Sequence, residues 1–546
     1  TIQPVEHSTV VGVGVQLPEA SRPVLRSQRI LPCCAPHPAI LTLGAVLALT
    51  CPLFLQRMSM SSQPYQPHDP SHDLPSLVPV HALRVLEALE RAGAEAWIVG
   101  GWVRDALRGC PAHDVDITTS ARWQEAERIL HACGIEVHET GTAHGTLTAV
   151  IEGKPIEVTT YRIEGTYSDH RHPDEVRFVR DVREDLARRD FTINAMAFHP
   201  ARGLLDPFGG RDDLVRGVIR AVGDPGGRFG EDALRVLRAL RFAARLGFAI
   251  EGRTQEALRT HASGLRSIAS ERIGQELSGI VMSGRLAWAL MAQTEVMCEA
   301  IPELRACVGF EQHSPYHAYD VFEHTVRVCR AVEEFTGGLA AVELRWAAMM
   351  HDIAKPQTFT RDESGRGHFF GHPRRGADVT KGVLRRLALP KELVASVVAL
   401  IRLHDHPLSP TERSISRMLL ALERACPGYA RELAFSLIDL KRADAVSKTA
   451  AAASYAIELD RMSELLRRRV AGGVCCRVSD LAVGGADVMR ELGAAPGPLV
   501  GAVLADLLAQ VVNGRLPNER EALLDAIRTK SKTRSKRSLG LPEDQS

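Results

Sequence analysis

A short apolar run, followed by two glycines and then by a pair of aspartates, most constrains the fold of this 546-residue chain. The run covers residues 96–99, the glycines are Gly100–Gly101, and the aspartates are Asp114 and Asp116. Two glycines after a buried strand let the backbone approach a phosphate closely, and a helix beginning there directs free N–H groups at an anion. Arg104 adds a charge-assisted contact to a triphosphate. The pattern predicts a strand–turn–helix unit that binds nucleotide phosphates.

The two aspartates are the sharper chemical signal. Residues i and i+2 of a strand project from the same face, so Asp114 and Asp116 can hold Mg²⁺ ions that clamp the reacting oxygens of a phosphoryl transfer. An isolated Asp-x-Asp is more commonly a solvated turn, but the glycines upstream favour a metal site. Residues 154–160 alternate as a strand does, and Glu157 within them is either a third carboxylate of this site or an exposed strand residue.

A predicted helix over residues 231–245 places arginines at spacings of three, three and four, and therefore on one face. These are Arg235, Arg238, Arg241 and Arg245. Asp232 lies three residues before Arg235, and a carboxylate beside a guanidinium can read the Watson–Crick edge of a base. A solvated face is the alternative. The segment 188–196, which includes Arg189, supplies further cations just before another apolar stretch.

Charge and cysteine content exclude some classes of protein. Lysine and arginine total 67 against 66 aspartate and glutamate, a net charge of +1, which argues against a strongly basic nucleic-acid binder and an acidic disordered chain. Eleven scattered cysteines without a Cys-x-x-Cys pair indicate the reducing cytoplasm. The apolar run 38–55 is marginal as a membrane span because polar residues and a proline interrupt it, so we expect no membrane contact. Residues 1–75 are expected to be a disordered or non-native extension, with Met58 or Met60 as the start.

These motifs follow in the order of the bacterial tRNA nucleotidyltransferase and poly(A) polymerase family, which the chain resembles over roughly residues 78–525. The resemblance implies an α+β fold: a polymerase β-like nucleotidyltransferase head with a small mixed sheet, then mostly α-helical neck, body, HD and tail domains. It also implies site residues. By this resemblance Gly101 and Arg104 contact the triphosphate, and Asp114 and Asp116 hold magnesium. Arg189 lies near the nucleotide. Asp232 and Arg235 select the base, and Arg238 and Arg241 support them.

The implied reaction adds cytidine, cytidine and adenosine to the 3′ end of tRNA from CTP and ATP. The nearest alternative is a poly(A) polymerase, which uses ATP alone. The tract 159–185, with Tyr167–Arg171 inside it, is more similar to the CCA-adding members. An alternative of another class is an RNA-binding HD hydrolase with an inactive head, and the intact Asp114 and Asp116 argue against it.

A second set of residues has the composition of a metal site. It comprises His324, His351, Asp352 and Asp444, with His372 and His404 as accessory residues. Imidazole and carboxylate together suit a divalent transition metal, which can activate water beside a phosphate. The order resembles the HD phosphohydrolase domain, and this resemblance implies a phosphatase or 2′,3′-cyclic phosphodiesterase that cleans damaged tRNA ends. Pro373 stands where that family more often has glutamate. His372 and His404 bind phosphate or a second metal in the alternative interpretation.

The predicted division of the chain follows from these motifs. The domains are a catalytic head at 78–220, a helical neck with the template helix at 221–310, the HD domain at 311–450 and a helical tRNA-binding tail at 451–527. A basic disordered tail is predicted at 528–546. Six cations fall within residues 528–537 without an acid, and such a run adds salt-dependent affinity beside an RNA.

Overall fold

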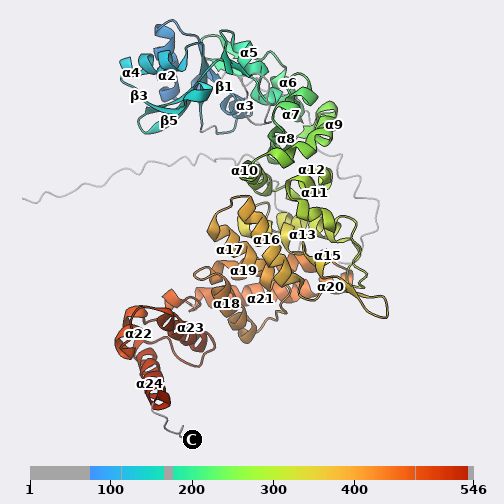
Figure 1. Ribbon diagram of the computed structural model, residues 1–546, viewed down its shortest axis with the longest axis vertical. Helices are drawn as coiled ribbons and strands as arrows, with labels where there is room; N and C mark the ends of the chain where they lie inside the picture. The colour runs from blue at the N-terminus through green and yellow to red at the C-terminus, as the bar shows by residue number, and fades with distance from the viewer. Residues whose placement is uncertain (1–73, 112–113, 165–175, 474, 539–546) are drawn as a thin grey trace, which may run out of the picture. The chain divides into compact units, whose positions relative to one another are not determined.

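The head is built on a seven-stranded mixed sheet (Figure 1). The computed structural model describes residues 74–111, 114–164, 176–473 and 475–538. The strand order is β3-β4-β5-β2-β1-β8-β9, with β2 and β5 parallel and the other neighbours antiparallel. The strands are β1 (Ala96–Val99), β2 (Asp116–Thr119), β3 (Glu136–Gly141), β4 (Thr146–Ile151), β5 (Lys154–Thr160), β8 (Ala197–His199) and β9 (Gly203–Leu205). The predicted mixed sheet is confirmed.

Two amphipathic helices, α2 (Val80–Arg91) and α4 (Trp123–Ala132), contact each other and the strands of the head sheet. In α2 the residues Val85, Leu86 and Leu89 are buried at helical spacing, so hydrophobic burial rather than local propensity holds the helix on the sheet. Helix α3 (Gly101–Leu107) follows β1 directly. A small hairpin of β6 (Arg162–Glu164) and β7 (Val176–Phe178) and helix α5 (Val182–Ala187) precede β8.

The next segment is helical, and one boundary differs from the sequence-based prediction. Its helices are α6 (Gly210–Arg216), α7 (Pro225–Glu231), α8 (Leu234–Leu246), α9 (Gly252–His261), α10 (Ser270–Val281), α11 (Leu286–Ala292) and α12 (Thr294–Ala300), with the two-residue strands β10 (Val218–Ile219) and β11 (Ala249–Ile250) pairing between them. The prediction of a continuous helix over residues 231–245 was wrong. Asp232 is extended, at φ −136° and ψ 104°, and its Oδ1 accepts the N–H of Leu234. A short acidic side chain competes in this way with the helical backbone and divides the segment.

A second helical region follows, with α13 packed on α14 and α19, and α17 packed on α14 and α16. Its helices are α13 (Val321–Phe335), α14 (Val342–Met350), α15 (Lys355–Thr358), α16 (His372–Arg386), α17 (Lys391–Leu403), α18 (Glu412–Ala425), α19 (Ala430–Val446), α20 (Ala450–Ala453) and α21 (Tyr455–Ala471). The fully buried Trp346 lies in its core. Between α15 and α16 stands a hairpin of β12 (Thr360–Arg361) and β13 (Gly367–His368).

The last helices, α22 (Gly485–Leu492), α23 (Pro498–Val512) and α24 (Arg520–Ser538), share a second hydrophobic cluster, to which Leu420 of α18 also contributes. The prediction of disorder from residue 528 was wrong for the first part of that segment, because α24 continues to Ser538. Leu523 and Ile527 are fully buried, and Arg528 donates to Glu491 at 2.8 Å, so a nucleated helix extends at little cost per residue.

Some sequence-based predictions stay untested. Residues 1–73, the tract 167–171 and residues 539–546 lie outside the described residues. The predicted domain boundaries also stay predictions. Across the described part of the chain, no helix combines the length and apolar character that crossing a membrane requires.

Candidate active sites

The turn between β1 and α3 lies against Arg189 and Asp116, the predicted magnesium ligand. Gly100 has φ 72°, and a Cβ at this position would lie 3.0 Å from Nη1 of Arg189 and 3.9 Å from Oδ2 of Asp116. The position therefore needs glycine both for its left-handed conformation and for the close approach of these two side chains. The structure thus brings together three of the elements predicted from sequence: the glycine turn, Asp116 and Arg189.

Strand register places a third carboxylate beside this aspartate. Asp116 is opposite Val99 on β1 and opposite Glu157 on the parallel neighbour β5. Burial raises the pKa of Asp116, Glu157 and Asp114 raise it further, and Arg189 opposes them. A buried carboxylate beside two others is costly to ionise unless a cation binds there, so these residues fit a divalent ion with oxygen ligands.

Arg104 is the predicted triphosphate residue whose surroundings differ most from expectation. Its side chain is 7% exposed, and its guanidinium donates to Asp105 at 2.7 and 2.9 Å and to Oδ1 of Asn194 at 2.8 Å. The same guanidinium lies 5.3 Å from the ring centroid of Phe242 on α8. In this structure Arg104 therefore connects α3 to the template helix instead of standing free at the glycine turn.

Each predicted template residue is held by an ion pair with a residue outside the predicted set. Asp232 accepts from Arg272 at 3.0 Å, and Arg235 donates to Glu231 at 2.6 Å. The remaining pairs are Arg238 with Asp190, at 2.7 Å, and Arg241 with Glu276, at 2.5 Å. Asp232 and Arg235 also contact each other through the backbone, where the Arg235 N–H donates to the Asp232 carbonyl at 3.0 Å. Arg245, the fourth arginine of the predicted stripe, is exposed.

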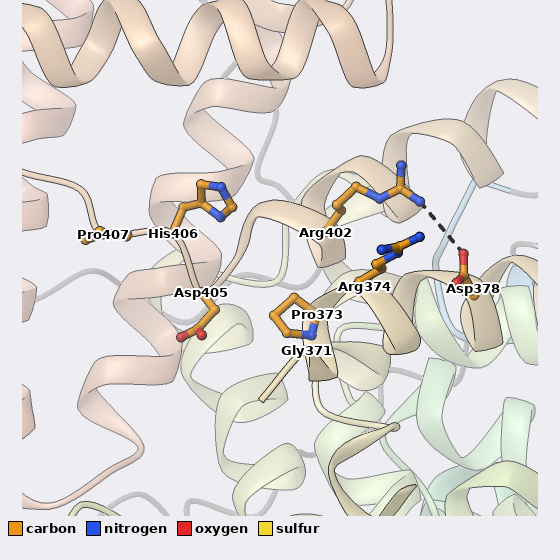
Figure 2. A pocket seen from close by; sticks show the side chains of 8 residues that line it. All are labelled: Gly371, Pro373, Arg374, Asp378, Arg402, Asp405, His406 and Pro407. Atoms are coloured by element: carbon orange, nitrogen blue, oxygen red, sulfur yellow. Dashed lines mark ion pairs between the residues drawn. The ribbon is translucent and has the colours of Figure 1, made fainter. Parts of the chain in front are cut away.

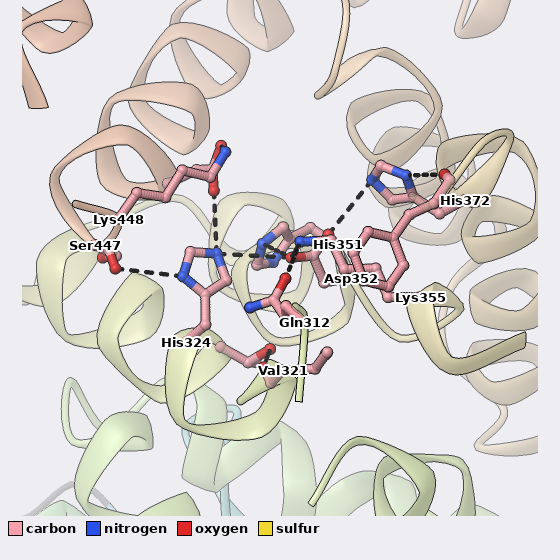
Figure 3. A network of polar contacts seen from close by, with 12 residues as sticks. Gln312, Val321, His324, His351, Asp352, Lys355, His372, Ser447 and Lys448 are labelled. Carbon is pink, nitrogen blue, oxygen red and sulfur yellow. Dashed lines mark hydrogen bonds and ion pairs between the residues drawn. The ribbon is translucent and has the colours of Figure 1, made fainter. Parts of the chain in front are cut away.

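The structure brings all six histidines and aspartates of the second set together. Figure 3 labels four of them: His324, His351, Asp352 and His372. The ligand atoms of His324, His351 and Asp444 lie within 4.8 Å of one another, and so do those of Asp352, His372 and His404. Asp352 joins the two groups, because its Oδ2 lies 3.1 Å from Nε2 of His351 and its Oδ1 lies 3.5 Å from Nε2 of His372.

The four buried histidines share one orientation. Each directs Nδ1 at a main-chain carbonyl oxygen, at 3.4 Å for His324, 3.0 Å for His351, 2.8 Å for His372 and 2.7 Å for His404. A carbonyl only accepts, so Nδ1 carries a proton in each ring, and the Nε2 atoms face the cluster. Among the described residues, Nε2 of His351 and Oδ2 of Asp352 find no partner with hydrogen-bond geometry. Nitrogen and carboxylate donors so arranged fit one or two transition-metal ions.

Two lysines that sequence reasoning missed complete this cluster. Lys355 is buried and lies 2.7 Å from Oδ2 of Asp352, and it donates to Gln312 at 2.8 Å. Lys448 donates to Asp444 at 2.6 Å. Burial raises the pKa of Asp352, but His351 and Lys355 outweigh burial and hold that pKa well below its usual value. Asp352 lies three residues before Lys355, in the turn that leads into α15, and Asp444 lies four residues before Lys448, which follows the end of α19. These short spacings were a signal present in the sequence.

Comparison with known proteins identifies the chain. Family models match residues 96–220 as a poly A polymerase head domain, 247–307 as a probable RNA and SrmB-binding site of polymerase A, and 380–527 as a putative tRNA nucleotidyltransferase domain 2. The chain is 34% identical over 456 residues to the CCA-adding enzyme of Geobacillus stearothermophilus, covering 83% of this chain and 98% of that one. It belongs to the bacterial CCA-adding enzymes.

Two further relatives agree with that assignment to the CCA-adding enzymes. The enzyme of Streptococcus gordonii is 32% identical over 453 residues, covering 82% of this chain and 97% of its own. The crystal structure of the Bacillus stearothermophilus CCA-adding enzyme in complex with CTP superposes with a TM-score of 0.58 at 30% identity, covering 84% and 98% of the two chains. The predicted tRNA nucleotidyltransferase activity with CTP and ATP is thereby confirmed. A nucleotidyltransferase head of this kind implies a divalent metal.

A cavity opens at the histidine and aspartate cluster of this CCA-adding enzyme, and a second cavity borders it. We call the first, of about 290 Å³, the HD pocket; Asp352, His372, His404 and Asp444 line it together with Lys355 and Lys448. The second, of about 660 Å³, shares Gly371 and Asp405 with it and is lined further by Arg374 and Arg402 (Figure 2). We call the second cavity the arginine pocket.

Proposed function

We propose that Asp114 and Asp116, with Glu157 beside them, hold the Mg²⁺ ions of nucleotide transfer in this CCA-adding enzyme. The observation that supports this assignment is the register of β2 against β5, which aligns Asp116 with Glu157 beneath the glycine turn. Magnesium bound there supplies charge neutralisation at the α-phosphate and a lowered pKa for the attacking 3′-hydroxyl. The chain itself contributes the turn at Gly101 and the guanidinium of Arg189, which approach the triphosphate and orient it.

Base selection is assigned to Asp232 and Arg235, with Arg238 and Arg241 in support. The ion pairs around these four residues support a preorganised template, because each side chain is already fixed before a base arrives. A carboxylate accepts an amino proton of cytosine or adenine, and a guanidinium donates to a ring nitrogen or carbonyl. Donors and acceptors that are fixed in advance discriminate more strongly than mobile ones, because they do not have to be ordered when the base binds. Arg104 is assigned to the triphosphate and reaches it when its contact with Asn194 opens.

The HD pocket is proposed as a separate metal-dependent phosphohydrolase centre, a phosphatase or 2′,3′-cyclic phosphodiesterase for damaged tRNA ends. The orientation of His324, His351, His372 and His404 supports a divalent transition metal held with Asp352 and Asp444, and such a metal supplies an activated water. Lys355 and Lys448 add positive charge beside the carboxylates and bind the phosphate oxygens of the substrate. Helix α16 begins at His372, and Pro373 in its first turn is compatible with that start.

Two active centres predict separable variants. Asp114→Ala is expected to abolish nucleotide addition to tRNA and to leave hydrolysis of a 2′,3′-cyclic phosphate unchanged, whereas Asp352→Ala is expected to do the reverse. Addition is measured with labelled nucleotide on tRNA lacking its 3′ end, and hydrolysis with a cyclic mononucleotide. A single substitution that removes both activities from folded protein would contradict two independent centres. Absence of nucleotide addition by the wild type, with hydrolysis retained, would support the alternative of an inactive head.

We also place this enzyme in the cytoplasm. Every described cysteine is a free thiol. Free thiols persist in a reducing compartment, where tRNA is also made and used.

A further inference from the structure

We propose that Phe370 is the surface on which the base of an RNA 3′-terminal nucleotide stacks when its phosphate enters the HD pocket, and that the arginine pocket receives the preceding nucleotide. This inference rests on the hydrolase activity proposed for the HD pocket. It assigns recognition residues to that centre that lie outside its metal-type cluster.

Phe370 is an exposed aromatic side chain at a catalytic-type cavity. It is 78% exposed and lines the HD pocket. Its ring is stacked on His368, with ring centroids 5.2 Å apart and an angle of only 7° between the planes. His368 therefore lies parallel to Phe370 and offset from it, and the 78% exposure of the Phe370 side chain leaves area for a further flat ring. Stacking on an aromatic side chain is the general way in which unpaired bases are bound.

The support behind this ring is fixed in advance. Asp362 lies 2.7 Å from Nε2 of His368 and also accepts from the hydroxyl of Ser364 at 2.6 Å and from the N–H of Arg366 at 3.0 Å. These bonds fix His368, the last residue of β13, to the turn of the β12–β13 hairpin. A preorganised platform loses little conformational freedom on binding, so the stacking energy appears in the affinity.

The HD pocket also has groups for the phosphate of the same ligand. Lys355 and Lys448 stand beside the metal-type carboxylates, and Arg366 on the hairpin lies 5.3 Å from the ring centroid of Tyr316, which lines the same pocket. A cationic interior with an aromatic rim fits a ligand that is anionic at one end and flat at the other. A nucleotide has this form, whereas a phosphate ester without a base leaves Phe370 unused.

The arginine pocket extends the site beyond one nucleotide. Gly371 and Asp405 line both cavities, so the two cavities adjoin at these residues. Figure 2 shows Arg374 and Arg402 on one side of the arginine pocket and Asp405 on the other. Arg402 lies 3.8 Å from Asp378, and Arg374 is exposed. An exposed guanidinium beside the path out of the HD pocket fits the next backbone phosphate of a strand. Because the chain is a CCA-adding enzyme, a tRNA 3′ end is the strand at hand.

The first test uses two phosphate monoesters that differ in the base, adenosine 2′-phosphate and glycerol 2-phosphate. Phe370→Ala is expected to raise KM for adenosine 2′-phosphate at least about fivefold, the lower range of a lost base stack, with kcat little changed. Glycerol 2-phosphate kinetics are expected to stay the same, and Phe370→Trp is expected to restore the wild-type KM. Equal kinetics of wild type and Phe370→Ala on both esters would overturn the assignment of Phe370.

The second test concerns the strand. Arg374→Ala is expected to raise KM severalfold for a dinucleotide that carries a 2′-phosphate end and to leave adenosine 2′-phosphate unaffected. Arg375→Ala is the matched control, because Arg375 is exposed, donates to Gln357 at 2.8 Å and lies outside both cavities. The same KM for the dinucleotide in Arg374→Ala and Arg375→Ala would refute a role of the arginine pocket.

Binding separates this inference from the proposed hydrolase. Calorimetric titration of chelator-treated full-length protein with adenosine 2′-phosphate is expected to give weaker binding in Phe370→Ala than in wild type. This expectation holds whether or not the pocket hydrolyses the ligand. If wild type hydrolyses neither ester with any divalent metal, the proposed hydrolase fails and this titration alone decides the role of Phe370. Identical titrations of the two proteins would overturn the stacking surface even if wild type is an active hydrolase.

Discussion

The pairing of Asp190 with Arg238 gives the sharpest test of how the template helix is held on the head. Asp190 is 8% exposed and accepts from Nε and Nη2 of Arg238 at 2.8 and 2.7 Å. It also accepts the N–H of Phe191 at 2.8 Å and the side-chain amide of Asn194 at 3.2 Å. The Asp190 carboxylate thus connects the segment 188–196 to α8.

The magnitude follows from burial. Two unit charges about 4 Å apart attract by about 4 kcal/mol at an effective dielectric constant of 20. Part of this is offset by desolvation, and Arg238 is 35% exposed, so we expect a net coupling of about 2 kcal/mol. Glu87 and Arg91 form a matched exposed pair at 2.7 Å, with side chains 57% and 76% exposed, for which we expect no more than about 0.5 kcal/mol.

The assay is a double-mutant cycle at each pair, read from urea unfolding of the full-length protein. The variants are Asp190→Asn with Arg238→Gln, and Glu87→Gln with Arg91→Gln. Arg238 and the side-chain amide of Asn194 lower the pKa of Asp190 against the effect of burial. A lowered folded-state pKa means that this stabilisation is complete at neutral pH and is lost only as the pH falls below about 4. Equal coupling at the two pairs, or a coupling at Asp190 that vanishes between pH 8 and 6, would refute the reasoning.

Three further predictions address other contacts. Arg272→Ala removes the guanidinium that holds the template carboxylate, so misincorporation of UTP is expected to rise about tenfold in single-nucleotide addition assays, with partial rescue by Arg272→Lys. Asp352→Asn removes a charge shared by both metal-type groups, so metal content measured by mass spectrometry is expected to fall while CCA addition persists; full metal content would count against the cluster. In Gly274→Ala the new Cβ would lie 2.1 Å from the carbonyl oxygen of Leu387, so we expect a loss of about 2 kcal/mol in thermal unfolding, against no loss for Gly252→Ala, where nothing lies within 4 Å.

Local patterns in the sequence predicted the parts of the sites that depend on local backbone. Gly100 follows the buried strand β1 and Asp116 begins β2, so apolar runs in the sequence marked the backbone that positions both residues. The metal-type cluster was also recognisable, because histidines and aspartates are rare on otherwise apolar helices. In each of these cases the residue type itself restricted the local structure or the site in which the residue could lie.

The ion-pair partners of the predicted residues could not be predicted from local sequence patterns. Arg272 lies 40 positions from Asp232, and Asp190 lies 48 positions from Arg238, so only the folded chain brings each pair together. The break at Asp232 arises from a side chain that caps the next helix, and helical periodicity alone carries no sign of it. Long-range ion pairs of this kind depend on tertiary packing, which residue spacing does not encode.

Nucleotide addition to a defined tRNA tests the central claim most directly. Purified protein is given tRNA that lacks its last three nucleotides, with Mg²⁺ and with CTP, ATP or both. We expect growth by two nucleotides with CTP alone and by three with both nucleotides, followed by arrest, because the same template residues select each base in turn. Long tails formed with ATP alone would contradict the account and establish the poly(A) polymerase alternative.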